Sequence, residues 1–342
     1  MRHRDAAKQK NAQAGLSLAS RRSLTIRRKR FRQGFAYYGK SGQRIRNPDV
    51  LKRLGRLAVP PAYEDVTYAA DPLAHLQAVG RDAAGRWQYR YHPEWEKVRE
   101  RRKTRHLLRL LQSLPRIRRQ VTAMLSTREP TREFAMAAAI ALVDATGLRS
   151  GTARHERLSG ARGAVTLHKS NVEISGQSLT LTFKAKGGKH VVKGIKAPRL
   201  VPAIKALQRL PGRRLFLYRD GDQVRAIRVR DVNLLLRSVA ACNVCLKDFR
   251  TLRASMHVVE TLMRTERASS QTTRKRQLKQ AIERAADDLA NTATVCRKSY
   301  VHDAIVDAFE RGTLPGNGKS TSGKRPPARQ VLSDIVNGHS GS

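Results

Sequence analysis

Acidic side chains are scarce in this chain of 342 residues, and their scarcity narrows the range of partners. There are 27 Asp and Glu residues against 69 Lys and Arg, which gives a formal net charge of +42. Such a surplus does not suit an enzyme for small neutral substrates and predicts a polyanionic partner, of which nucleic acid is the commonest. Long apolar runs and basic amphipathic anchors are also lacking, so a membrane surface is the weaker alternative and no membrane partner is expected.

Cysteine is rare as well: the chain has Cys242, Cys245 and Cys296. The first two form a C-x-x-C motif, but no second pair of ligands follows at the spacing of a zinc site. The sequence therefore favours reduced, partly buried thiols in a cytoplasmic protein over a metal or redox centre. No metal or other cofactor is expected.

The segment Met1–Arg30 lacks the apolar stretch of a secretory signal. It is rich in arginine and poor in acids, as organelle transit peptides are. A disordered basic arm over residues 1–33 that holds DNA nonspecifically is the simpler interpretation. Near the other end, Gly, Ser, Pro and Lys dominate residues 313–342, which predicts a disordered C-terminal tail.

The length of 342 residues is enough for two domains between these tails, and a hydrophobic content of 40% is enough for a sizeable core. Residues 34–93 predict a small, mainly antiparallel β domain. Its expected elements are a hairpin at 35–38 with a turn at Gly42, a helix from Asn47 to Leu57, and strands at 75–80 and 87–91.

Residues 94–312 predict a larger, mainly helical domain with a small sheet, so the fold class is α+β. A long charged helix from Glu94 is expected to end near Pro115, and the helix after Pro130 is expected to be closed by Gly147. The remaining expected elements are strands at 172–174, 179–185 and 190–192, a hairpin over 215–229, and helices at 231–242, 251–263, 274–290 and 301–311.

Five side chains in separate local strings suggest the chemistry: Arg149, Lys186, Arg250, Asn291 and Tyr300. Arg149 lies in Gly-Leu-Arg-Ser-Gly, Lys186 ends Phe-Lys-Ala-Lys, and Arg250 lies in Lys-Asp-Phe-Arg-Thr. Together they supply one nucleophile, three fixed cations and one neutral hydrogen-bond donor. That set suits the cleavage of a phosphodiester without a metal.

In type, order and spacing these residues resemble the type IB DNA topoisomerases, specifically the small poxvirus-like enzymes of bacteria. The resemblance extends from Gly34 to Arg311. It implies a monomeric clamp in the bacterial nucleoid, in which a β-rich DNA-clamp domain and a recombinase-like catalytic domain close around supercoiled duplex DNA. The implied activity is relaxation of positive and negative supercoils through transient cleavage of one strand, a 3′-phosphotyrosyl intermediate and religation, without ATP or metal.

The resemblance also implies a role for each residue. Tyr300 is the nucleophile, although a phenol with a pKa of about 10 needs nearby cations to become reactive. Arg149 and Arg250 match phosphate oxygens bidentately. Asn291 donates one more hydrogen bond to a phosphate oxygen, and as an alternative it caps the preceding helix.

Lys186 is the expected general acid for the leaving 5′-oxygen. Strand alternation places Lys184 and Lys186 on the face opposite Leu181 and Phe183, beside a Gly-Gly turn. Because alanine stands where the family has glycine before its lysine, Lys184 and Lys189 are alternatives for this role.

Further residues are expected to contact DNA, with Gln88 placed to read a base edge. They are Arg81, Arg86, Gln88, Tyr89 and Tyr91 in the first domain and His155, Lys184 and Lys247 in the second. The sequence departs from the family pattern at two places: His155 stands in place of a tyrosine, and Thr251-Leu252-Arg253 replaces a Thr-aromatic pair. Neither is expected to touch the catalytic residues.

Two motifs are rejected. Gly34–Ser41 fits the P-loop pattern, but basic residues rather than an apolar strand precede it. Asp220-Gly221-Asp222 suits a hairpin turn better than a metal site. Two other functions are considered: a tyrosine recombinase, which the 34–93 domain and the lack of a His-x-x-Arg string at Arg250 disfavour, and a DNA-packaging protein, which has no use for the five strings.

Overall fold

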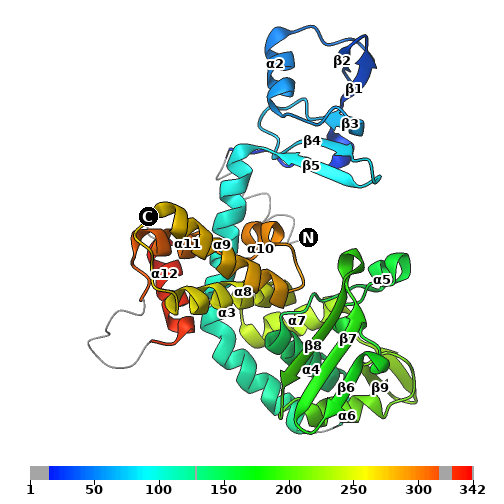
Figure 1. Ribbon diagram of the computed structural model, residues 1–342. Coiled ribbons are helices and arrows are strands. Elements are labelled where there is room, and N and C mark those ends of the chain that lie inside the picture. Colours follow the sequence, from blue (N-terminus) through cyan, green and yellow to red (C-terminus); the bar gives the residue numbers. More distant parts are fainter. Residues whose placement is uncertain (1–14, 128, 316–325, 341–342) are drawn as a thin grey trace. The chain divides into compact units, whose positions relative to one another are not determined.

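The computed structural model describes residues 15–127, 129–315 and 326–340 (Figure 1). The chain divides into two compact units, Met1–Arg102 and Lys103–Ser342. The division lies inside the long helix α3 (Pro93–Ser126). A β-rich first unit and a mainly helical second unit with small sheets confirm the predicted α+β class.

The first unit is built on one antiparallel sheet with the order β2-β1-β3-β4-β5. Its strands are β1 (Ile26–Phe31), β2 (Gly34–Tyr38), β3 (Glu64–Tyr68), β4 (Leu76–Arg81) and β5 (Trp87–Tyr91). The helix α2 (Pro48–Arg56) begins where the sequence predicts, because the Asn47 side chain accepts hydrogen bonds from the first free backbone amides. Leu54 of this helix packs into a cluster with Ile26 and Tyr68. The Gly34–Ser41 string lies on β2 and the following turn, without the helix that a P-loop requires.

The predicted disordered arm over residues 1–33 is wrong in its second half. Residues 1–14 lie outside the described part of the chain, but β1 forms an inner strand of the sheet, paired with both β2 and β3. Leu16, Leu24 and Ile26 are buried. Ladder pairing and burial of these few apolar side chains outweigh the local excess of charge, which composition alone cannot reveal.

The core of the second unit surrounds α4 (Arg132–Thr146), a helix whose side chains are apolar and buried on most of its circumference. Gly147 closes it in the left-handed conformation with φ 64°, as predicted. The sheet β6-β7-β8 is antiparallel, with β6 (Val172–Ser175), β7 (Ser178–Lys184) and β8 (His190–Lys196), and a separate hairpin joins β9 (Leu217–Asp220) to β10 (Gln223–Ala226).

The other helices of this unit include three that the sequence did not predict: α5 (Ala153–Ser159), α6 (Val201–Gln208) and α10 (Ala293–Ser299). Each has eight residues or fewer, so each spans too few residues for a helical hydrophobic periodicity to be recognised in the sequence. The longer helices are α7 (Val229–Ala240), α8 (Leu246–Met263), α9 (Gln271–Asp288) and α11 (Asp303–Arg311). None of the helices in the described ranges is long and apolar enough to cross a bilayer.

The prediction that the long helix ends near Pro115 is also wrong, because α3 continues to Ser126. An internal proline costs about 3 kcal/mol. Ile117 and Val121, in the part of the helix that follows the proline, are nearly inaccessible, and burying each contributes roughly 1.5–3 kcal/mol. Tertiary burial therefore outweighs the local penalty.

The predicted disordered tail ends in a helix instead, α12 (Ala328–Ser340). Val331, Leu332 and Val336 are buried, and the helix packs against α8 and α11. Residues 316–325 lie outside the description. The Gly, Ser and Lys content around this helix predicts disorder. The apolar side chains of the helix become stable only through their packing partners, which composition does not reveal.

Candidate functional site

Four of the five predicted residues meet where the ends of several helices of the second unit converge. Arg149 lies in the loop after α4, Arg250 within α8, Asn291 just after α9, and Tyr300 at the end of α10. The Arg149 guanidinium donates to the Asn291 Oδ1 atom at 2.5 Å. The Arg250 guanidinium carbon lies 4.9 Å from the centre of the Tyr300 ring. The fifth residue, Lys186, is exposed in the turn between β7 and β8.

The loop that carries Arg149 is held by a close approach of two backbone segments. Gly151 adopts φ 73°, and a Cβ atom on Gly163 would lie 2.3 Å from the Arg149 carbonyl oxygen. The amides of Ala164 and Val165 donate to the Arg149 and Ser150 carbonyls at 2.7 and 2.8 Å. Gly163 is required here for space and Gly151 for its conformation. The Arg149 side chain therefore extends from a tightly held backbone.

Arg250 is 3% exposed, and it links two helix ends. Its Nη1 donates to the Gly147 carbonyl and its Nη2 to the Leu289 carbonyl at 3.1 Å. A guanidinium has five N–H groups, so these bonds leave donors free. The buried Nε has no hydrogen-bond partner among the described residues. Arg250 can therefore hold the two helix ends together and still donate hydrogen bonds to an anion.

Tyr300 is 5% exposed and its main chain is fixed. The Ser255 hydroxyl donates to the Tyr300 carbonyl at 3.0 Å. Burial is the largest single influence on the phenol and raises its pKa, but the charges of Arg250, Arg149 and Lys247 together outweigh it. The pKa of Tyr300 therefore lies below its ordinary value of 10, as a phenolate-forming nucleophile requires.

Asn291 uses its side chain for the site rather than for the helix. The end of α9 is satisfied by backbone, since the Asn291 amide donates to the Ala286 carbonyl at 2.8 Å. The Asn291 side chain is buried, and its Nδ2 has no partner in the described structure. An unpaired buried donor is costly, and here it belongs to the amide whose Oδ1 accepts from Arg149.

The hairpin of β7 and β8 has the predicted alternation: Leu181 and Phe183 are buried, and Lys184 and Lys186 are exposed. A different lysine of the turn reaches the site. The Lys189 Nζ donates to the Asn291 carbonyl at 3.0 Å.

The predicted DNA contacts in the first unit lie along β4, β5 and their connecting turn. Arg81 pairs with Asp65 at 3.2 Å. Asp82 binds both the Arg86 guanidinium and the Gln88 amide nitrogen, each at 2.9 Å, so the donor proposed for a base edge already has a partner. Tyr89 and Tyr91 are exposed, with ring centres 6.3 Å apart in a stacked arrangement.

The predicted contacts in the second unit are all exposed. His155 lies on α5, where its Nδ1 is 2.7 Å from the Thr152 hydroxyl. Lys184 is at the end of β7, and Lys247 is in the first turn of α8.

Sequence reasoning missed three residues at the convergence of the helix ends: Lys193, Arg253 and Asp288. Arg253 donates to the Ala145 carbonyl at 2.7 Å and pairs with Asp288. Neither partner is one of the five predicted residues, but both lie at the helix ends that precede Arg149 and Asn291. The spacing in the sequence could have pointed to Arg253, because side chains three residues apart, such as those of Arg250 and Arg253, lie on one helix face.

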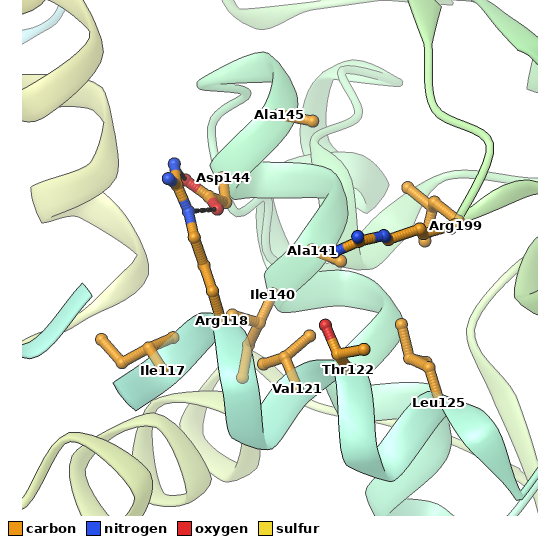
Figure 2. Close-up of a pocket in the computed structure, with 11 residues that line it drawn as sticks. Ile117, Arg118, Val121, Thr122, Leu125, Ile140, Ala141, Asp144, Ala145 and Arg199 are labelled. Carbon is orange, nitrogen blue, oxygen red and sulfur yellow. Dashed lines mark hydrogen bonds and ion pairs between the residues drawn. The ribbon is translucent and has the colours of Figure 1, made fainter. Parts of the chain in front are cut away.

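A pocket of about 340 Å³ lies beside this region and contains none of the five predicted residues. Figure 2 shows it between α3 and α4, with the ion pair of Arg118 and Asp144 on one side and Arg199 on the other. Its lining is mostly apolar, with Val121 and Leu125 among the residues. It holds no tyrosine and none of the five predicted residues, so the candidate site for phosphodiester chemistry lies outside it.

Metal ligands are not grouped in the described part of the chain, where no three His, Cys, Asp or Glu side chains could hold an ion together. The cysteines are free thiols; Cys296 is buried, and Cys242 and Cys245 are half-buried. Burial raises the pKa of Cys245 to about 11, which makes a poor metal ligand or nucleophile.

Comparison with known proteins gives two family matches on separate parts of the chain. Residues 92–313 match the family described as eukaryotic DNA topoisomerase I, catalytic core. Residues 34–82 match bacterial DNA topoisomerase IB, N-terminal domain. A relative from Acanthamoeba polyphaga mimivirus, named DNA topoisomerase 1B, is 27% identical over 282 residues, covering 80% of this chain and 84% of the relative.

Proposed function

Because this chain belongs to the type IB DNA topoisomerases, isomerases that act on DNA, we propose that it relaxes positive and negative supercoils by cutting and resealing one strand. The observation that carries the proposal is Tyr300 lying against the Arg250 guanidinium beside the paired Arg149 and Asn291. A nucleophile, two fixed cations and an unpaired amide donor in one region support the proposal that a phosphate binds there. We further propose that a monomer acts, that both units contact one duplex, and that the protein works at the nucleoid in the cytoplasm.

In the cleavage step the Tyr300 phenol gives its proton to water, and its oxygen attacks phosphorus and forms the 3′-phosphotyrosyl ester. The bond from phosphorus to the 5′-oxygen breaks, and that oxygen takes a proton from a lysine of the β7–β8 hairpin. Arg149, Arg250 and the Asn291 Nδ2 bind the non-bridging oxygens, where negative charge accumulates. Religation is the reverse, with the 5′-hydroxyl as nucleophile. The ester conserves the bond energy, so ATP is not needed.

Wild-type protein is expected to relax plasmids of either supercoil sign in EDTA and without ATP. Agarose-gel separation of topoisomers measures this directly. Recombination would require specific sites, and a packaging protein would leave the linking number unchanged after deproteinisation. Absence of relaxation across a range of salt concentrations would contradict the proposed function.

The general acid is assigned to Lys186, and DNA with sulfur in place of the bridging 5′-oxygen tests this assignment. A leaving thiolate needs no proton donor. Lys186→Ala is expected to slow cleavage of ordinary DNA by roughly 10²–10⁴ and to regain near wild-type rates with the sulfur substrate. Single-turnover formation of the covalent complex provides the measurement.

Asn291→Ala is the matched control, because a donor to a non-bridging oxygen should not be rescued by sulfur. Lys189 is the alternative, since its Nζ already lies at the Asn291 carbonyl. If Lys189→Ala shows the loss and the rescue while Lys186→Ala shows neither, the acid is Lys189.

A further inference from the structure

The C-terminal ends of α4 and α9 converge at the proposed catalytic site. The last carbonyls of a helix have no partner within it and carry partial negative charge. Arg149 follows α4 closely, and Asn291 follows α9 closely. Whatever fixes these two helix ends relative to each other therefore also fixes the two side chains that are proposed to bind phosphate.

Two arginines of α8 bridge these ends, one above the other on the same helix face. Arg250 bonds the carbonyls of Gly147 and Leu289. Arg253 bonds the Ala145 carbonyl through Nη1 at 2.7 Å, and its Nε and Nη2 hold the two carboxylate oxygens of Asp288.

Lys193 of β8 makes a third bridge. Its Nζ donates to the Thr146 carbonyl at 2.8 Å, the Asp288 carbonyl at 2.7 Å and the Asp288 Oδ1 at 3.1 Å. An ammonium group has three protons, and all three are used. The Lys193 and Asp288 side chains are 12% and 20% exposed, so the pair is largely withdrawn from water.

Asp288 is the acid that joins Lys193 and Arg253. Burial raises its pKa, but both cations together outweigh that effect and hold the pKa below its ordinary range. Without the Asp288 carboxylate, the Lys193 and Arg253 charges would repel each other in a poorly hydrated place and lose the acceptor that both bind.

We propose that Asp288, together with Arg253 and Lys193, is a positioning residue that holds Arg149 and Asn291 at the spacing needed for one phosphate. The proposal rests on the proposed function. None of the three needs to touch DNA, because they act through the backbone on which the phosphate ligands are mounted. A shift of about 1 Å in such ligands can cost roughly 10²-fold in rate.

The first test compares Asp288→Asn with Asp231→Asn. Asp231 is a matched control, since it pairs with Arg132 at the opposite end of α4 and its side chain is 23% exposed. Single-turnover formation of the covalent complex is measured with saturating enzyme and a short duplex. Asp288→Asn is expected to lower the rate roughly 10- to 100-fold with little change in DNA affinity, and Asp231→Asn to change it by about twofold at most.

The second test separates positioning from loss of stability by combining variants. Asp288→Asn is expected to add little to Arg149→Ala, because the ligand that it positions is already absent. In the Lys186→Ala background it should retain its full effect. Arg253→Gln, which leaves Lys193 paired with Asp288, serves as a milder second variant and should show the same pattern if Asp288→Asn folds poorly.

Equal effects of Asp288→Asn and Asp231→Asn would overturn the proposal, and so would equal losses in the two backgrounds. The proposed function is judged separately by the wild type. If wild-type protein forms no covalent complex, the function itself falls and this proposal with it. If the wild type reacts and Asp288→Asn and Arg253→Gln match it, only the positioning role falls.

Discussion

Tyr300→Phe is expected to remove all covalent complex formation and all relaxation while DNA affinity changes by about twofold at most. The variant lacks the oxygen that attacks phosphorus, so no ester can form. The fold should persist, because the ring remains against Arg250. The hydrogen bond from the Ser255 hydroxyl goes to the main-chain carbonyl of residue 300 and does not involve the phenol oxygen. Denaturing gels detect the covalent protein–DNA species, and fluorescence anisotropy measures binding.

Tyr218→Phe is the matched control for this substitution. Tyr218 lies on β9, partly buried against the same core, and we expect the loss of its hydroxyl to leave cleavage unchanged. A covalent complex that persists in Tyr300→Phe would contradict the assignment. Tyr89 and Tyr91, the exposed tyrosines of β5, would then be the next candidates for the nucleophile.

Arg250→Ala is expected to lower the cleavage rate by roughly 10²–10³, the usual consequence of removing one donor that stabilises a developing oxyanion. Arg250→Lys should recover part of the loss, since it keeps the charge without the planar fork. Single-turnover cleavage rates measure both. Arg267→Ala is a structural control, because Arg267 likewise bonds two backbone carbonyls, those of Phe309 and Glu310 at the end of α11. A comparable loss in Arg267→Ala would reduce Arg250 to a structural role.

The pH dependence gives Arg250 a second, independent test. In the wild type the Tyr300 pKa is below 10, because the effect of nearby cations outweighs the effect of burial. Among those cations, Arg250 lowers the pKa most. Its removal leaves the effect of burial, so the Tyr300 pKa rises. The rate limited by phenolate should therefore reach its plateau at a higher pH in Arg250→Ala, and the defect should be greatest near neutral pH. An unshifted profile would show that Arg250 does not act on the phenol.

Local patterns in the sequence were sufficient for the family and for many of the elements. Gly147 ends α4 because a glycine accepts the left-handed conformation without strain. The alternation before Lys186 predicts which strand face is buried, since successive side chains point to opposite faces. The strings around Arg149, Arg250 and Tyr300 predict a family because they combine residue type, order and spacing.

Only the tertiary structure decided which of these features are stable and how they meet. Burial carries α3 through Pro115 and makes helix α12 from a segment whose composition predicts disorder. The bonds from Lys189 to Asn291 and from Arg253 to Asp288 join segments that are distant in the sequence. Local periodicity contains no information about such partners, because capping a helix end or pairing a buried charge depends on where other segments pack. The sequence by itself therefore determined the family and the candidate reactive groups, and the packing of the second unit decided their positions.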